Sequence, residues 1–330
     1  MNDRNANPAQ ARGTPDSTQE TVIETDSLTR KFKKIKAVDN LDLRISHNEL
    51  FGLVGPDGAG KTTLLRLLAG LLKITSGSAH VAGHDLTERP EAVKPKIGYM
   101  AQQFSLYAQL TVMENLNFFA DLYAVTLEER KERTERLLSF AGLTPYTERR
   151  AEHLSGGMKK KLALACTLIH DPPILLLDEP TTGVDPVSRR EFWSILTDLH
   201  VRGRTIVVST PYMDEADRCT RVGLMYEGRM IRCAPPDEIR SQVRGELIEL
   251  IAEHWQAARA AVGELPGVLQ VQTYGTTLHL IVDNAAERLP EVEAHLEEER
   301  IAYSRLRPTQ LRMEEAFLSL VDQREQERWE

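Results

Sequence analysis

The chain has 330 residues with 41% hydrophobic and 27% charged residues, enough for one large domain and a smaller one. Its formal net charge of −8 argues against nucleic acid as a partner, because such a partner usually requires a basic face. Three widely spaced cysteines, Cys166, Cys219 and Cys233, do not form the pattern of a disulfide framework, and a reducing compartment fits them best.

The first segment, residues 1–20, is polar and lacks the apolar core of a signal sequence, so we expect a disordered leader. No apolar run approaches the roughly 18 to 20 residues that span a bilayer. The nearest run, Leu64–Leu72, is interrupted by Arg66 and Gly70 and is better interpreted as a helix. Any membrane role is therefore expected to come from a partner chain.

Residues 21 to about 240 are expected to form one α/β domain. Its apolar and β-rich runs predict strands, several of them buried, at Thr21–Thr25, Leu41–Ile45, Glu49–Val54, Ile174–Leu177, Thr205–Ser209 and Val222–Tyr226. A helix is expected over Lys61–Leu72, directly after a glycine-rich loop. Between Phe104 and Leu154 the pattern changes to charged helical periodicity, as in Leu127–Phe140, which predicts an inserted helical subdomain over about 104–154.

The last part of the chain, residues 241–330, is expected to form a small separate α+β domain after Pro235-Pro236. Its pattern predicts strands at 246–252, 267–273, 276–282 and 301–306, and helices at 254–263, 286–299 and 312–322. Gly275 is suited to the hairpin turn between the second and third of these strands. The order β-α-β-β-α-β is typical of a ferredoxin-like fold.

Residues 55–62 read G-P-D-G-A-G-K-T between a predicted strand and a predicted helix, the context in which a glycine loop binds phosphate. Glycines let backbone N–H groups approach phosphate oxygens, and the helix N-terminus adds its dipole. Lys61 supplies a positive charge for the β- and γ-phosphates, and the Thr62 hydroxyl is a hard ligand for Mg²⁺. The alternative is a glycine turn that only caps a helix. The predicted nucleotide contacts are Gly55, Pro56, Asp57, Gly58, Ala59, Gly60, Lys61, Thr62 and Thr63.

The run Leu154-Ser155-Gly156-Gly157-Met158 lies between this loop and a strand that ends in Asp178-Glu179. The order of these three motifs resembles the ATP-binding subunits of ABC transporters over residues 21 to about 240. The resemblance implies a P-loop NTPase fold with an α-helical subdomain. The run Tyr212-Met213-Asp214-Glu215-Ala216 and the small C-terminal appendage resemble bacterial exporters of drugs or lipids in particular.

The resemblance also implies roles for single residues. Asp178 would hold Mg²⁺ through water, and Glu179 would polarise the attacking water, whereas in isolation the pair could simply be exposed acids closing a strand. Gln102 would join the Mg²⁺ shell, with Gln103 as the competing assignment. Phe32 would stack on adenine, with core packing as its alternative.

Two further motifs would complete a site on a second chain. Ser155, Gly156 and Gly157 would cap the γ-phosphate bound by the opposite subunit, although serine and glycines also make ordinary helix caps. Asp185, in Gly183-Val184-Asp185-Pro186, would reach across the dimer interface, although Asp-Pro is also a common turn starter. Lys160-Lys161 stands where the family has Gln-Arg, a change that the sequence does not explain.

One position departs from the family pattern: Pro211 stands where the family carries a histidine that hydrogen-bonds the γ-phosphate. Proline has no side-chain donor and no backbone N–H. Three outcomes are open. The first is a homodimer in which hydrolysis is slow. The second is a dimer with a different ATPase subunit that has a complete site. The third is that the proline is tolerated and hydrolysis is near normal.

The function expected from the sequence is ATP binding and hydrolysis that drive a separate transmembrane permease subunit through closure of a dimer of ATP-binding subunits. The location expected is cytoplasmic, peripheral on the inner face of the cell membrane. The alternatives are a regulatory subunit that scarcely hydrolyses ATP and a soluble ABC ATPase without transport.

Overall fold

A computed structural model describes residues 20–103 and 106–327, and the chain divides at Pro236 into two compact units. The predicted boundary was residue 240, which lies inside helix α6 (Pro236–Ser241). The predicted leader, apart from Glu20, and the start of the predicted helical subdomain at Phe104 lie outside the described residues.

The first unit is built around a six-stranded sheet with the strand order β10-β9-β3-β8-β7-β6. Five of these strands are parallel, and β10 pairs antiparallel with β9. Every residue of β3, β7 and β8 is buried, as expected of parallel strands covered on both faces. The carboxyl ends of these three strands therefore meet at one edge of the sheet. The strands are β3 (Leu50–Val54), β6 (Ile97–Met100), β7 (Ile174–Asp178), β8 (Thr205–Thr210), β9 (Arg221–Tyr226) and β10 (Arg229–Ala234).

A second, antiparallel sheet of order β2-β1-β4-β5 packs against helix α1 (Lys61–Leu68). Its strands are β1 (Thr21–Phe32), β2 (Ile35–Ser46), β4 (Ser76–Val81) and β5 (His84–Asp85). The first two are longer than their apolar runs predict, because the ladder between them continues through mixed polar and apolar residues to the hairpin turn, where Phe32 pairs with Ile35. Ile23, Leu65 and Leu176 belong to one core, which joins this sheet, α1 and the six-stranded sheet.

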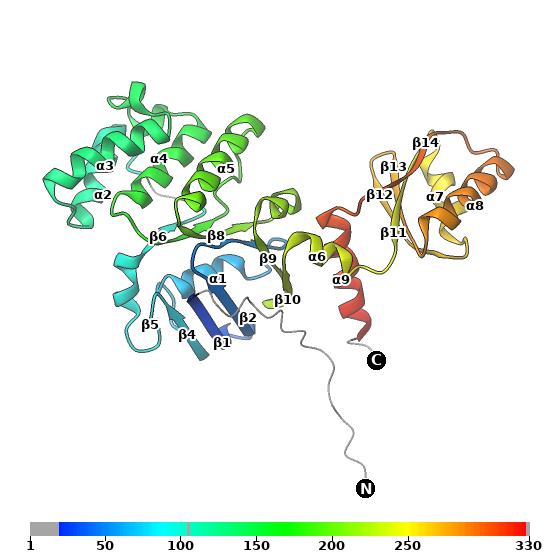
Figure 1. The fold of residues 1–330 in the computed structure, drawn as a ribbon, viewed down its shortest axis with the longest axis horizontal. Coiled ribbons are helices and arrows are strands. Elements are labelled where there is room, and N and C mark those ends of the chain that lie inside the picture. Colours follow the sequence, from blue (N-terminus) through cyan, green and yellow to red (C-terminus); the bar gives the residue numbers. More distant parts are fainter. Residues whose placement is uncertain (1–19, 104–105, 328–330) are drawn as a thin grey trace, which may run out of the picture. The chain divides into compact units, whose positions relative to one another are not determined.

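The helical part of the first unit consists of α2 (Val112–Leu122), α3 (Leu127–Phe140) and α4 (Gly156–Leu168), which contact one another (Figure 1). Thr111 starts α2 with a capping box, in which its side chain accepts from the N–H of Glu114. Helix α4 also contacts α5 (Pro186–Val201) and β6. The short 3₁₀ segments are η1 (Pro90–Lys96), η2 (Thr144–Tyr146), η3 (Ala151–His153) and η4 (Met213–Arg218).

The second unit has a strand or helix over each predicted segment. It contains β11 (Glu246–Ala252), α7 (Trp255–Gly263), β12 (Val268–Tyr274), β13 (Thr277–Val282), α8 (Ala285–Glu298), β14 (Tyr303–Thr309) and α9 (Met313–Glu327). Its antiparallel sheet has the order β12-β13-β11-β14, with α7 and α8 packed on an apolar core. A buried pair joins α9 to β13, because His279 Nδ1 lies 2.7 Å from Glu315 Oε1.

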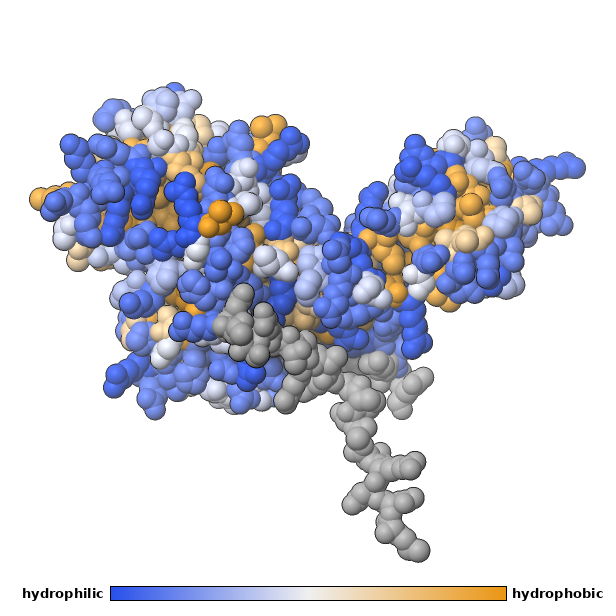
Figure 2. Space-filling model, in the orientation of Figure 1, coloured by the Kyte–Doolittle hydropathy of each residue, from blue (hydrophilic) through white to orange (hydrophobic). Residues whose placement is uncertain are grey.

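The visible surface of the first unit is mostly hydrophilic, with small hydrophobic areas scattered over it (Figure 2). Within residues 20–103 and 106–327, none of the helices combines the length and the apolar character that a membrane span requires.

Candidate active site

The glycine loop follows β3 and enters α1 by a tight path that tolerates only glycine at two points. Gly60 has φ 102°, and a Cβ there would lie 2.1 Å from the carbonyl oxygen of Ala37. A Cβ on Gly55 would lie 2.1 Å from the carbonyl oxygen of Met225. These close approaches explain why the chain needs glycines here. Asp57 is exposed at the tip of the loop.

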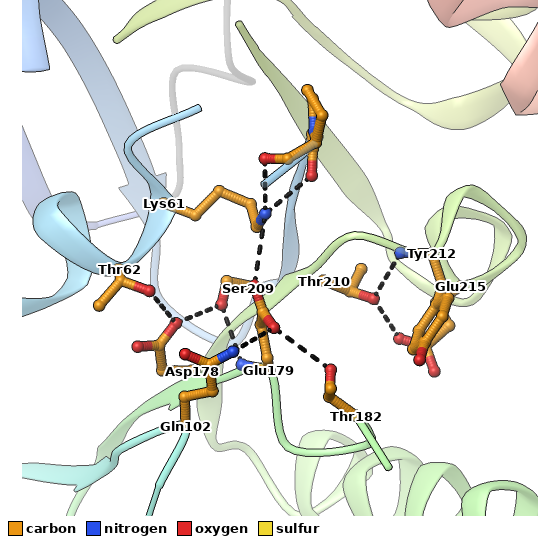
Figure 3. Close-up of polar contacts among 12 residues, drawn as sticks. Lys61, Thr62, Gln102, Asp178, Glu179, Thr182, Ser209, Thr210, Tyr212 and Glu215 are labelled. Atoms are coloured by element: carbon orange, nitrogen blue, oxygen red, sulfur yellow. Dashed lines mark hydrogen bonds and ion pairs between the residues drawn. The ribbon is translucent and has the colours of Figure 1, made fainter. Parts of the chain in front are cut away.

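Lys61 is folded back onto this loop and is only 3% exposed. Its Nζ donates to the carbonyl oxygens of Gly55 at 2.8 Å and Pro56 at 3.0 Å (Figure 3). The same Nζ lies 3.4 Å from Glu179 Oε1. The lysine thus brings its charge to the acidic end of β7.

Asp178 ends β7 with no exposed surface. Its Oδ1 accepts from Thr62 Oγ1 at 3.0 Å and from Ser209 Oγ at 2.8 Å. Its Oδ2 is buried and has no hydrogen-bond partner among the described residues. A buried carboxylate oxygen without a partner beside a threonine hydroxyl is a donor set that suits a hard divalent cation such as Mg²⁺.

Glu179 follows in the left-handed region, with φ 45°, which costs a residue other than glycine about 1–3 kcal/mol. Its N–H donates to Ser209 Oγ at 3.0 Å. Its Oε2 accepts from Gln102 Nε2 at 2.8 Å and from Thr182 Oγ1 at 3.3 Å. Of the two adjacent glutamines, it is thus Gln102 whose side chain contacts Glu179. Both acids are buried, unlike a pair that merely closes a strand.

The segment after β8 is fixed by a separate polar network on the far side of Ser209 (Figure 3). Thr210 Oγ1 donates to Glu215 Oε2 at 2.6 Å and accepts from the N–H of Tyr212 at 3.0 Å. Glu215 also pairs with Arg189 Nε at 2.7 Å, and the Arg189 guanidinium lies 4.4 Å from the centre of the Tyr212 ring. Tyr212 therefore contacts Arg189, and Pro211 lies between two fixed neighbours.

The predicted dimer-facing residues lie at the starts of α4 and α5. Ser155 caps α4 by accepting from the N–H of Met158 at 3.3 Å, and Asp185 caps α5 by accepting from the N–H of Ser188 at 3.0 Å. Hydrogen bonds from Ser188 lower the pKa of Asp185. A Cβ on Gly157 would lie 2.5 Å from Ser188 Oγ, so the two helix starts pack together. The side chains of Ser155 and Asp185 are exposed.

Phe32, at the end of β1, is 42% exposed and lies against the Arg30 guanidinium, 4.6 Å from the ring centre. Phe32 is therefore partly exposed and is not part of the apolar core.

Two residues of the site were missed in the sequence. Ser209 contacts both acids, and Thr182 contacts Glu179. A signal existed for Ser209, because a serine ends the apolar run of β8, beside the strand that carries Asp178.

Comparison with known proteins decides the family. The family model described as ABC transporter matches residues 38–182, which include the glycine loop, Gln102, Ser155 and both acids. The daunorubicin resistance ATP-binding protein DrrA3 of Streptomyces coeruleorubidus is 35% identical over 310 residues, or 92% of this chain and 96% of that protein. The chain belongs to the ABC transporter ATP-binding proteins.

Other ABC proteins are similar in sequence or structure. The probable multidrug ABC transporter ATP-binding protein YbhF of Escherichia coli is 43% identical over 307 residues, and the chain spans 52% of its length. The dimeric structure of MJ0796, a bacterial ABC transporter cassette, matches 64% of this chain and 98% of that chain, with 29% identity and a TM-score of 0.60. The predicted P-loop NTPase fold is confirmed. Phe32, Asp185 and Pro211 lie outside the residues that the ABC family model matches.

Proposed function

We propose that the chain binds ATP with Mg²⁺ and hydrolyses it as the ATP-binding subunit of an exporter. The observation that carries this proposal is the convergence of Lys61, Asp178 and Glu179 at one end of the parallel sheet. A phosphate-binding lysine, a metal-binding carboxylate and a water-orienting carboxylate are the parts that ATP hydrolysis requires.

Nucleotide binding uses the loop and Lys61. The backbone N–H groups of residues 55–62 and the N-terminus of α1 favour an anion. Lys61 Nζ exchanges its hydrogen bonds to the carbonyls of Gly55 and Pro56 for the β- and γ-phosphate oxygens. Phe32 offers its exposed ring to adenine. The exposed Asp57 carboxylate adds a negative charge at the loop, and we expect it to weaken ATP binding slightly.

The metal site consists of Thr62, Asp178 and Gln102. When bound, Mg²⁺ neutralises charge on the β- and γ-phosphates. Ser209 holds Asp178 Oδ1, which leaves the unpartnered Oδ2 for the cation or its water.

In hydrolysis, Glu179 orients a water molecule toward the γ-phosphorus and accepts a proton from it. The bond between the γ-phosphorus and the bridging oxygen breaks, and that oxygen stays on ADP. The hydrogen bond from Gln102 fixes the position of the Glu179 carboxylate. Most of the catalysis is thus positioning and charge stabilisation.

A second ATP-binding subunit completes the site. The adjacent starts of α4 and α5 would meet the γ-phosphate held by the opposite chain. They carry Ser155, Gly156, Gly157 and Asp185, all of them exposed except Gly157. The dimeric form of the MJ0796 cassette supports this arrangement. The opposite chain is a second copy or a different ATPase. Pro211 favours the latter, because such a partner would carry the histidine in its own site and give the dimer one fast and one slow site.

A transmembrane permease is the second partner, and the subunit would act at the cytoplasmic face of the membrane. This part is supported by the names of the relatives, which include multidrug, daunorubicin resistance and Nod factor export ATP-binding proteins. We propose an amphiphilic drug or a lipid-like molecule as the exported substrate. The second candidate, a regulatory subunit with little hydrolysis of its own, is favoured by Pro211 alone.

The test is phosphate release by the purified chain with ATP and Mg²⁺, alongside a separate measurement of ATP binding. Glu179→Gln should lower the rate by about 10²–10⁴-fold while ATP still binds. Lys61→Ala should abolish binding. Glu128→Gln, an exposed acid at the start of α3, is the matched control. A rate that does not fall in Glu179→Gln would remove the catalytic role of this residue and favour the regulatory candidate.

A further inference from the structure

Lys160 connects two parts of the molecule that serve different sites in the proposed dimer. It lies on α4, the helix whose first turn contains Gly156 and Gly157. Its Nζ donates to the backbone carbonyl oxygen of Gln102 at 3.0 Å. Together with Gln102, Gly156 and Val184 it lines a pocket between α4 and the segments after β6 and β7.

The ammonium of Lys160 lies in the electrostatic field of the active site. Burial lowers the pKa of Lys160, and the carboxylates of Glu179 and Asp178 act in the opposite direction. The Lys160 ammonium is thus within electrostatic range of both buried acids.

A continuous polar path leads from α4 to the catalytic acid. Lys160 holds the backbone of Gln102, Gln102 Nε2 donates to Glu179 Oε2 at 2.8 Å, and Glu179 Oε1 lies 3.4 Å from Lys61 Nζ. A displacement of α4 therefore changes the position of Gln102, and with it the surroundings of Glu179.

We propose that Lys160 is a positioning residue that couples the two sites of the dimer. When Ser155–Gly157 close on the nucleotide of the opposite chain, α4 moves with them, and Lys160 passes this movement through Gln102 to Glu179 of its own chain. The inference rests on the proposed function, because it requires ATP hydrolysis at a site shared between two subunits.

The neighbouring lysines show why this role belongs to Lys160. Lys161 points to α5, where its Nζ lies 2.5 Å from Glu191 Oε2. Lys159 carries the same charge one position earlier on the same helix. Lys160 directs both its length and its charge toward Gln102.

The experiment compares Lys160→Met, Lys160→Arg and the matched control Lys159→Met in the full-length chain. ATPase rates are measured against ATP concentration, together with thermal unfolding. We expect Lys160→Met to lower kcat about tenfold, the effect of losing a hydrogen bond from a charged group. KM should stay within about twofold, and the Hill coefficient should fall toward about 1, because coupling between the sites is lost. Lys160→Arg should restore most of kcat, and Lys159→Met should resemble the unmodified chain.

Equal kinetics in Lys160→Met and Lys159→Met would overturn the proposal. If Lys160→Met does not fold, Lys160→Gln, which keeps a donor without the charge, replaces it and should show a smaller loss of kcat in the same direction. Failure of the proposed function is distinct, because the unmodified chain would then lack ATPase activity that depends on Glu179.

Discussion

Pro211→His tests whether the missing histidine limits turnover. Position 211 directly follows β8, whose Ser209 contacts Asp178 and the N–H of Glu179. The flanking residues are already held, Thr210 by its hydrogen bond to Glu215 and Tyr212 by its N–H bond to Thr210. A histidine can therefore be introduced without rebuilding the turn.

The expected gain follows from one hydrogen bond to a charged phosphate, worth about 1.5–3 kcal/mol. Because about 1.36 kcal/mol corresponds to a factor of ten, kcat should rise about tenfold to a hundredfold. Loss of proline should destabilise the folded chain by about 0.4–1 kcal/mol. Pro211→Ala is the control, since it has this cost without the imidazole.

The assay is steady-state phosphate release at saturating ATP and Mg²⁺, with the rate of Glu179→Gln subtracted. We expect the rate of phosphate release by Pro211→His to exceed the rates of both the unmodified chain and Pro211→Ala. If all three turn over equally, position 211 does not limit hydrolysis. An equal rise in Pro211→His and Pro211→Ala would instead indicate that the rigid proline, and not the missing donor, restrains the site.

Two other predictions concern buried carboxylates. Glu215→Gln breaks the ion pair with the partly exposed Arg189 next to the active site. It should therefore lower the free energy of unfolding by about 2–3 kcal/mol in urea titrations and slow ATP turnover. An unchanged free energy of unfolding together with an unchanged turnover rate would show that this network is dispensable. In the second unit, burial of Glu315 opposes ionisation, but hydrogen bonds, chiefly from its histidine partner, outweigh it and lower the pKa of Glu315. This contribution to stability is present at pH values above the pKa of the carboxyl in the unfolded chain, and it is lost as the pH falls through the lower pKa of the folded chain. In urea titrations, the difference in the free energy of unfolding between the unmodified chain and Glu315→Gln should therefore shrink below about pH 4.

The sequence predicted the fold well where local patterns decide structure. The apolar runs of β7 and β8 and the charged helical periodicity of α3 were recognisable without knowledge of their neighbours. The strands β1 and β2 were predicted too short, because the buried apolar residues of their outer parts, such as Leu28 and Val38, stand singly among polar residues and are placed by backbone pairing. Such pairing leaves no signal in the hydropathy of either strand.

The site was predictable as a set of motifs but not as a set of contacts. Lys61 and Glu179 are far apart in sequence, and their 3.4 Å approach depends on how α1 and β7 pack. The choice of Gln102 over Gln103 depends on the path of one backbone segment after β6. Thr182 gave no sequence signal, because a threonine in a turn has many ordinary roles. Lys160 was visible as a departure from the family pattern, but its hydrogen bond to Gln102 was not.

Glu179 has a consequence for how the chain behaves between transport cycles. One carboxylate oxygen accepts hydrogen bonds from Gln102 and Thr182, and the other faces Lys61 Nζ. A water molecule must therefore compete with three protein groups for the carboxylate. Arriving phosphate is the ligand that would draw Lys61 away from this carboxylate and leave one of its oxygens open to water. In the chain without nucleotide, the Glu179 carboxylate is therefore occupied by protein groups. Binding of ATP must rearrange these contacts before Glu179 can orient a water molecule.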